Sequence, residues 1–508
     1  MKKTMRILYI FIIFLALSGL FAACSDDGAD NNNQNGQRDS GDDSGANDAA
    51  AAEPADYFEA RKQVQDSLPE MDFGGEEIKA LLFDVYKPFI MSEEAIGEIV
   101  NDAVYAANLA VSERFNIKFT HVGEGLGEIQ QVELFRRTVK SGDDAFHFAS
   151  LHDLASAPLS LEGCFVDAYD MKYLDFDKPW WNKDVLEDFT VFNQCYAIFP
   201  AMSYMGLARS RVLFMNEDKM ADFGLALPYD EVINGTWTLD KLIALTKGAY
   251  RDLNGSGAPD NDDFYGFISE RAFYGALDSF DIPTMGRGPD GLVSLVADMA
   301  KISAMIEKLY DWLIVSGDAR FLLEKDGMVG NDLRCDEFAA GKALIQRGQM
   351  FEALPELLGS DINYGILPMP KLDERQEKYR TSCGEFLVAV PVTVSGELLD
   401  RVSVIIEAMS AEGYKHVFPA YFKIALQVKY FDNQSVQMID IISENRKPSF
   451  SFTYDSGGIL SYTVHQMLSS GGAPTRDFAS YYERREGQLQ GQINRINNAF
   501  IKLDAERG

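Results

Sequence analysis

The chain has 508 residues, of which 46% are hydrophobic and 12% aromatic, which is enough for a large core and more than one domain. It carries 78 acidic residues against 47 basic ones, a formal net charge of −31. This charge excludes nucleic acid and anionic lipid as favoured partners, and it leaves neutral ligands or ligands bound through local features.

The amino terminus has the pattern of a bacterial lipoprotein signal peptide over residues 1–23. Lys2, Lys3 and Arg6 form a positive start, Ile7–Phe21 is apolar, and two alanines precede Cys24. The alternative is a transmembrane anchor, for which the uncharged run is at the short limit. The small residues before a cysteine favour lipidation of Cys24, for example with palmitate. We therefore expect a protein anchored by lipid at the extracytoplasmic face of the cell membrane.

Residues 24–69 follow as a predicted tether. Residues 25–53 are rich in Asp, Asn, Ser, Gly and Ala, with Arg38 as the one basic residue. Such a segment lacks the apolar side chains that a core needs, so a solvated, disordered linker is favoured over a folded polar segment.

The first folded region alternates predicted strands with predicted helices. Strands are expected at 76–85, 116–122 and 146–151, separated by a long helix capped by Ser92 and by a helix at about 127–140. This order predicts a mostly parallel sheet with helices on its faces.

A second organised stretch runs from residue 212 to residue 267. The apolar strand Val212–Met215 meets Asn216, a good N-cap, and the helix that follows ends at Gly224. Thr238 is placed to cap the next helix, with Trp237 before it as part of a hydrophobic staple. An acidic, glycine-containing loop and a short Tyr-Gly-Phe strand complete the stretch.

This order resembles the extracellular solute-binding proteins (family 1, sugar and oligosaccharide type) of bacterial ABC transporters. Three later segments add to the resemblance: Phe-x-x-Gly-Lys-Ala within 334–347, the string YGILPMPK at 364–371, and the apolar run 386–391. The resemblance covers roughly residues 70–500. It implies an α/β, two-lobed periplasmic-binding-protein-like fold (type II), in which each lobe is a mixed, mostly parallel sheet flanked by helices.

The resemblance also implies how the chain is divided. Lobe 1 would comprise residues 70–201 with 385–430, and lobe 2 residues 202–384 with 431–508. Hinge crossovers are expected near 200–206, 383–387 and 425–435.

The acidic loop matches a twelve-residue calcium loop. Gly257 stands where such a loop turns sharply, and oxygen ligands fall at the expected spacing. The predicted ligands of a structural Ca²⁺ are Asp252, Asn254, Ser256, Ala258 (through its carbonyl), Asp260 and Asp263. The alternative is a loop of Asx turns capped by its own side chains.

A sugar site needs aromatic faces for the ring and planar polar side chains for the hydroxyls. From the positions at which the resembling family places its cleft, eight ligand-binding candidates follow: Asp84, Asp153, Trp181, Tyr204, Tyr274, Arg347, Gln349 and Glu385. The alternatives are a helix-cap role for Asp153 and core packing for Tyr204 and Trp181. Trp237 and Trp312 are expected to be structural.

The chemistry-bearing residues show no enzymatic pattern. The five histidines have no metal-ligand spacing, and the chain has neither a Gly-x-Ser-x-Gly elbow nor a phosphate-binding Gly-Lys-Ser/Thr. The four cysteines of the folded region, Cys164, Cys195, Cys335 and Cys383, permit two disulfides or four buried thiols.

The sequence thus predicts a non-enzymatic, monomeric binding lipoprotein. By the resemblance it is expected to capture a carbohydrate, and more specifically an oligosaccharide, between its lobes and to deliver it to the membrane permease subunits of an ABC importer. The alternatives are a lipid-anchored glycoside hydrolase and the same fold binding a peptide or another small solute.

Overall fold

The computed structural model describes residues 59–270, 274–322, 330–384, 386–425, 433–455, 458–469 and 472–507. All of them belong to the compact unit of residues 51–508. The predicted signal peptide, Cys24 and residues 25–58 of the predicted tether lie outside the described residues. No helix among the described residues is long and apolar enough to cross a membrane.

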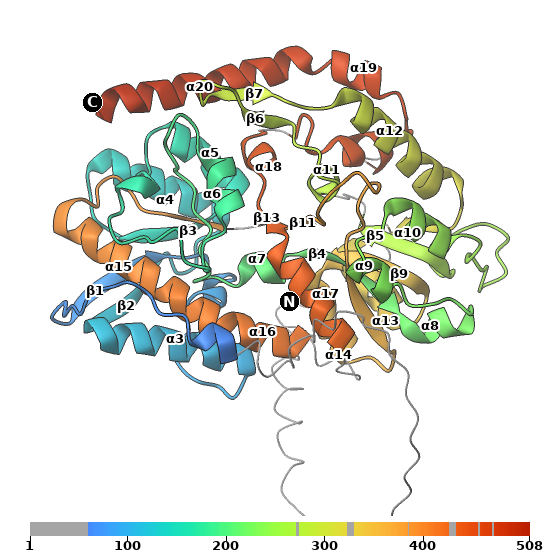
Figure 1. The fold of residues 1–508 in the computed structure, drawn as a ribbon, viewed down its shortest axis with the longest axis horizontal. Helices are drawn as coiled ribbons and strands as arrows, with labels where there is room; N and C mark the ends of the chain where they lie inside the picture. Colours follow the sequence, from blue (N-terminus) through green and yellow to red (C-terminus); the bar gives the residue numbers. More distant parts are fainter. Residues whose placement is uncertain are drawn as a thin grey trace, which may run out of the picture. The chain divides into compact units, whose positions relative to one another are not determined.

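Two β-sheets organise the described chain, one in each lobe (Figure 1). The first sheet has the order β12-β3-β1-β2, in which β1 pairs in parallel with β2 and β3, and β12 pairs antiparallel with β3. Its strands are β1 (Glu76–Leu81), β2 (Ile117–Val122), β3 (Phe148–His152) and β12 (Phe386–Ala389).

Helices pack around the first sheet. α3 packs against α15 and α16, and α4 packs against β3 and α5. The helices of this lobe are α3 (Ile99–Phe115), α4 (Glu128–Ser141), α5 (Asp153–Leu161), α6 (Lys183–Phe189), α15 (Gly396–Glu412) and α16 (Phe418–Ala425). Short helical segments accompany them: η1 (Lys87–Phe89), η2 (Ala168–Asp170) and η4 (Gly413–Val417).

The second sheet has the order β10-β4-β9-β5-β8. β4 pairs antiparallel with both neighbours, whereas β5 runs parallel to β9 and β8. Its strands are β4 (Arg211–Asn216), β5 (Tyr265–Glu270), β8 (Ala319–Leu322), β9 (Ala343–Gln349) and β10 (Tyr364–Pro368). The prediction of a two-lobed α/β fold with mixed sheets is therefore confirmed.

Most helices around the second sheet lie in the stretches of chain that connect its strands. They are α8 (Glu217–Asp222), α9 (Tyr229–Ile233), α10 (Leu239–Thr246), α12 (Met299–Tyr310), η3 (Asp311–Val315), α13 (Gly330–Ala339), α14 (Met350–Leu358) and α17 (Asn433–Glu444). Asn216 caps α8 as predicted, because its side-chain oxygen accepts from the amide of Lys219 at 2.9 Å. Trp237 is structural as predicted: it is 1% exposed and donates from Nε1 to the carbonyl of Pro368.

A third group of elements links the two lobes. They are α7 (Met205–Ala208), α11 (Ala276–Ser279), β6 (Met285–Arg287), β7 (Val293–Leu295), β11 (Thr381–Ser382), β13 (Arg446–Lys447), α18 (Phe450–Tyr454), η5 (His465–Ser469), α19 (Phe478–Glu483) and α20 (Glu486–Arg507). In Figure 1, α20 runs past α5 of the first lobe and past β7, with which it is in contact.

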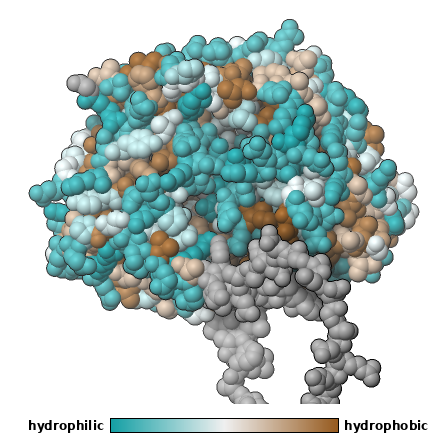
Figure 2. Space-filling view, in the orientation of Figure 1, coloured by the Kyte–Doolittle hydropathy of each residue, from teal (hydrophilic) through white to brown (hydrophobic). Residues whose placement is uncertain are grey.

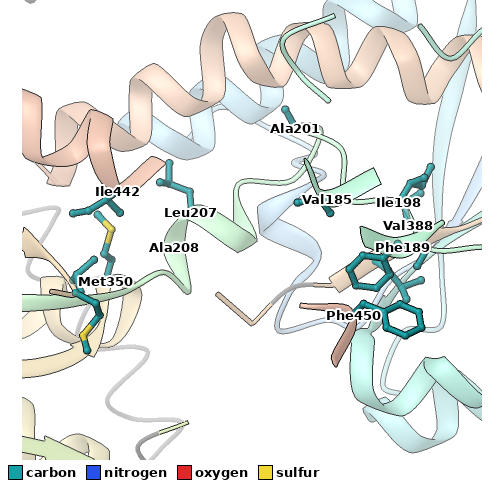
Figure 3. Packing of buried hydrophobic residues seen from close by; sticks show 14 of the residues in the cluster. Val185, Phe189, Ile198, Ala201, Leu207, Ala208, Met350, Val388, Ile442 and Phe450 are labelled. Carbon is teal, nitrogen blue, oxygen red and sulfur yellow. The ribbon is translucent and has the colours of Figure 1, made fainter. Parts of the chain in front are cut away.

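One hydrophobic cluster extends through both lobes and through α7. Figure 3 shows Leu207 and Ala208 of α7 beside Met350 and Ile442, with a second group of apolar side chains beyond them. Because the apolar core is continuous along this path, the junction between the lobes is fixed by burial and not by loops alone.

Several local predictions differ from the structure. Ser92 does not cap the first helix, which begins only at Ile99 with Glu98 at the N-cap position. Instead the Ser92 hydroxyl donates to the carbonyl of Glu94. Thr238 occupies the N-cap position of α10 but makes no side-chain capping hydrogen bond. The predicted C-terminal helix is two helices, α19 and α20.

A buried carboxylate, Glu407 of α15, holds the tryptophan pair of the first lobe. The indole N–H of Trp180 donates to one carboxylate oxygen and that of Trp181 to the other, both at 2.9 Å, and the amide of Asp175 adds a third donor. Burial raises the pKa of Glu407 to about 7, although these three hydrogen bonds favour its ionised form. The four cysteines of the folded region are buried thiols, so the predicted alternative without disulfides describes this structure.

The raised pKa of Glu407 predicts a pH-dependent free energy of unfolding. A carboxyl whose folded-state pKa lies above its unfolded value stabilises the fold fully below the unfolded value and loses that contribution as the pH rises through about 7. We expect the loss to be at most about 3 kcal/mol. Urea unfolding of the wild type and of Glu407→Gln at pH 5 and pH 8 measures it.

The drop in the free energy of unfolding from pH 5 to pH 8 should be smaller in Glu407→Gln than in the wild type. The matched control is Glu397→Gln on the same helix, whose side chain is 91% exposed and which should leave the pH dependence unchanged. An equal drop in the wild type and in Glu407→Gln would contradict the prediction.

Candidate functional site

The pairing of β4 with β9 places polar side chains on one face of the second sheet. Arg211 lies opposite Gln349, and Leu213 lies opposite Arg347. Because side chains alternate along a strand, Arg211, Arg347 and Gln349 share one face. Arg347 and Gln349, both predicted ligand residues, lie within β9, and Arg347 is fully buried.

Arg209, just before β4, joins this face to the first lobe. Its Nε donates to Oε1 of Gln349 at 3.4 Å, and its guanidinium carbon lies 6.0 Å from the ring centroid of Phe386 at the start of β12. A Cβ atom on Gly384 would lie 3.3 Å from this guanidinium, so glycine permits the returning chain to pack against it. Glu385, the next predicted ligand residue, lies outside the described residues.

Tyr274 brings an aromatic ring to the same face. Its carbonyl accepts a 2.5 Å hydrogen bond from Nη2 of Arg347, and its half-buried ring lies 4.6 Å from the ring of Tyr462 between centroids. The two rings are tilted by 41° to each other. Tyr274 and Tyr462 therefore form an aromatic pair beside the arginine-bearing strands.

Asp153 approaches from the first lobe, as the first residue of α5 directly after β3. It is 2% exposed. One carboxylate oxygen accepts from the amide of Leu154 at 2.7 Å and lies 3.2 Å from Nδ1 of His152, while the other accepts from the Thr453 hydroxyl at 3.4 Å. Asp153 thus serves locally as a turn acceptor and also ties α5 to α18.

Electrostatics link these groups across the lobes. The pKa of Tyr462 is raised to about 12, mainly by burial and to a smaller extent by the neighbouring Tyr274 and Asp153, and the positive charge of Arg211 opposes this shift. The ring of Tyr462 therefore lies within electrostatic reach of a first-lobe carboxylate and a second-lobe guanidinium. We call the set Asp153, Arg209, Arg211, Tyr274, Arg347, Gln349, Phe386 and Tyr462 the junction site.

Two cavities adjoin the junction site. The larger, of about 330 Å³, lies beside Tyr462 between α5 and α20, and its walls include Leu154, Pro158, Tyr454 and Ile496. A volume of this size is at the lower end of the range for small-ligand pockets. Hydrophilic residues predominate over the middle of the face in Figure 2.

The smaller cavity, of about 60 Å³, is strongly polar. Ser382, which accepts a 3.3 Å hydrogen bond from Nη1 of Arg211, lines it together with Asp188, Asp278 and Lys447. Burial raises the pKa of Asp278 to about 6, while a hydrogen bond from Ser449 lowers it.

The remaining predicted ligand residues lie in other surroundings. Asp84 is exposed in a turn after β1 and accepts from the amide of Gly125 at 2.7 Å. The ring of Tyr204 lies between Phe89 and Tyr421, with centroid distances of 4.6 and 5.2 Å. Trp181 is buried against Glu407, as described above.

The sequence predicted Asp153, Tyr274, Arg347 and Gln349 but missed four members of the junction site: Arg209, Arg211, Phe386 and Tyr462. Two arginines directly before the apolar run of β4 are a detectable signal, since charged side chains at a strand end mark an edge of the core. Tyr462 follows a glycine-containing turn and has no comparable signal.

The acidic loop holds its carboxylates with its own N–H groups. Asp252 accepts from the amides of Gly255, Ser256 and Gly257, and Asp263 accepts from the amide of Leu253 and the hydroxyl of Tyr250. Asp260 accepts from the side chain of Asn254. Within the described part of the chain, no group of three or more His, Cys, Asp or Glu side chains is arranged to hold a metal ion. The loop has the geometry of the self-capped alternative, and calcium binding stays a prediction.

Comparison with known proteins identifies the fold. No protein-family model and no curated protein matches the chain. Among solved structures, the galacto-N-biose/lacto-N-biose I-binding protein of a Bifidobacterium longum ABC transporter, in complex with lacto-N-biose, matches 83% of this chain and 98% of its own, with a TM-score of 0.53 and 12% identity.

Two further structures match over a similar extent. The ABC substrate-binding protein Lmo0181 of Listeria monocytogenes, in complex with cycloalternan, covers 82% of this chain and 99% of its own, with a TM-score of 0.51 and 12% identity. UspC of M. tuberculosis matches 83% of this chain and 100% of its own, with a TM-score of 0.50 and 14% identity. The chain therefore has the two-lobed fold of ABC-transporter solute-binding proteins.

Proposed function

We propose that the protein is an extracytoplasmic solute-binding protein that captures a carbohydrate at the junction site and delivers it to the permease of an ABC importer. The observation that carries the proposal is the Tyr274–Tyr462 ring pair, which is bonded through the Tyr274 carbonyl to Arg347 and lies within electrostatic reach of Asp153 from the first lobe and Arg211 from the second. Aromatic faces stack on sugar rings, and planar polar groups bond their hydroxyls.

The structural neighbours support the same proposal. Two of them are binding proteins of ABC transporters, one in complex with lacto-N-biose and the other with cycloalternan. Because the contributing groups come from two lobes, a ligand that contacts both would favour a closed arrangement through its extra contacts. Lipid attachment at Cys24 would keep such a carrier at the membrane surface near its permease.

A thermal-shift screen of monosaccharides and oligosaccharides tests the proposal, followed by calorimetry on the compounds that stabilise the protein. We expect saturable binding without turnover, so product analysis after prolonged incubation should show the sugar unchanged. Release of a hydrolysis product would instead favour a glycoside hydrolase. Stabilisation by peptides and by no sugar would favour the same fold with another solute.

Removing the ring or the first-lobe carboxylate should weaken sugar binding. We expect Tyr274→Ala, Tyr462→Ala and Asp153→Ala each to lower the affinity by at least about tenfold, or about 1.4 kcal/mol. Tyr169→Ala is the control, because Tyr169 is 46% exposed and its hydroxyl pairs with Thr190 in the first lobe. Wild-type affinity in all three junction variants would remove the junction site as the sugar site.

The calcium prediction for the acidic loop is tested separately. Calcium bound by Asp252, Asp260 and Asp263 would replace part of their hydrogen bonding to the loop and would raise the Tm relative to EDTA by mass action. The difference should vanish in Asp252→Asn/Asp260→Asn. Equal Tm values for the wild type in calcium and in EDTA, with no heat of calcium binding, would contradict the prediction.

A further inference from the structure

Two arginines of the junction site, one buried and one half-buried, have no acidic partner among the described residues. Arg211 is 5% exposed and Arg209 is half-buried. Among the described residues no carboxylate oxygen lies within 4.0 Å of either guanidinium. Nη1 of Arg209 and Nε of Arg211 are buried and have no hydrogen-bond acceptor in the described part of the chain.

The groups that these arginines do contact are neutral. Arg209 donates to the side-chain amide oxygen of Gln349 and lies over the ring of Phe386, and Arg211 donates to the hydroxyl of Ser382. Asp278 is close enough for Arg211 to lower its pKa, but burial dominates and the net shift is upward. Within hydrogen-bonding distance the two cations therefore meet neutral groups, and Asp278, with a pKa of about 6, acts on Arg211 only from beyond ion-pair distance.

Other arginines of the chain show that acidic partners are readily supplied. Arg114 pairs with Asp66 at 2.6 Å, and Arg380 pairs with Asp281 at 3.1 Å. A buried charge without a counter-charge is costly. The chain has 78 acidic residues, yet no described carboxylate lies beside Arg209 and Arg211. This indicates that their positive charge is available to an anion from outside the chain.

We propose that the ligand of the junction site is an acidic carbohydrate, a uronic-acid type of sugar, whose carboxylate is bound by Arg209 and Arg211. The planar guanidinium fork matches a carboxylate and forms charge-assisted hydrogen bonds with it. The ring of such a sugar has the faces that Tyr274 and Tyr462 would stack against. This inference rests on the proposed function, since it names the class of carbohydrate taken by the same site.

The test compares acidic oligosaccharides with their neutral methyl esters, which match them in size and ring structure. The probes are oligogalacturonates and oligomannuronates of two to four sugars, each as the free acid and as the methyl ester, measured by calorimetry on the wild-type protein. We expect at least one free acid to bind, at least about tenfold more tightly than its ester. Its affinity should fall as salt is raised, and that of the ester should not.

Variants locate the binding. Arg209→Gln and Arg211→Gln should each lower the affinity for the acid by about tenfold or more and change that for the ester by less than about threefold. Arg211→Lys keeps the charge and loses the fork, so it should recover only part of the affinity. The control is Arg251→Gln, since Arg251 lies over Phe223 and donates to backbone carbonyls of the second lobe. Circular dichroism and Tm establish that each variant folds.

The outcomes separate this inference from the proposed function. If neutral sugars bind and no free acid is preferred, the inference is overturned and the carbohydrate-binding function stands. If an acid binds equally well to Arg209→Gln and Arg211→Gln, the assignment to these arginines is overturned. If neither the acids, nor the esters, nor the sugars of the wider screen bind, both proposals fail.

Discussion

The antiparallel pairing of β4 with β9 is the constraint on which the junction site depends. It sets Arg211 opposite Gln349 and keeps Arg347 on the same face, while Val212 and Phe214 of the same strand project to the opposite face and are fully buried. A shift of this register by one residue would move the guanidinium groups into the apolar core and expose that core. The burial of the core side chains therefore fixes the position of the polar ones.

The continuity of the apolar core through α7 has a mechanical consequence. Leu207 and Ala208 are buried in the same hydrophobic cluster as side chains of both lobes. Any change in the angle between the lobes must keep this segment covered, because exposing it to water costs free energy in proportion to its apolar area. The hinge predicted near 200–206 overlaps the start of this buried segment and stays a prediction.

The junction site contrasts with the rest of the molecule in its charge. The chain as a whole is strongly acidic, and its surface would repel an anion at long range. Within the junction site, however, three guanidinium groups, those of Arg209, Arg211 and Arg347, lie within a short stretch of two strands. Local positive charge in a largely desolvated setting acts more strongly than distant surface charge screened by salt, so the proposed preference for an acidic sugar would be set there.

The sequence by itself determined the elements and the fold class. Asn216 caps α8 and Gly224 adopts a positive φ just after it, as the local sequence predicts. The order of such caps, glycine stops and apolar runs along the chain predicts a two-lobed α/β fold. Half of the predicted ligand residues, which were chosen from the positions at which the resembling family places its cleft, also lie in the junction site.

What the tertiary structure alone decided is which distant side chains meet. Tyr462 beside Tyr274, Phe386 beneath Arg209, and Glu407 between two tryptophans are contacts between residues separated by more than 150 positions along the chain. No local periodicity encodes such pairs, since they result from the packing of whole helices and sheets. For the same reason Trp181, an attractive stacking residue in the sequence, is buried in the first lobe, where its indole N–H is bound by a carboxylate.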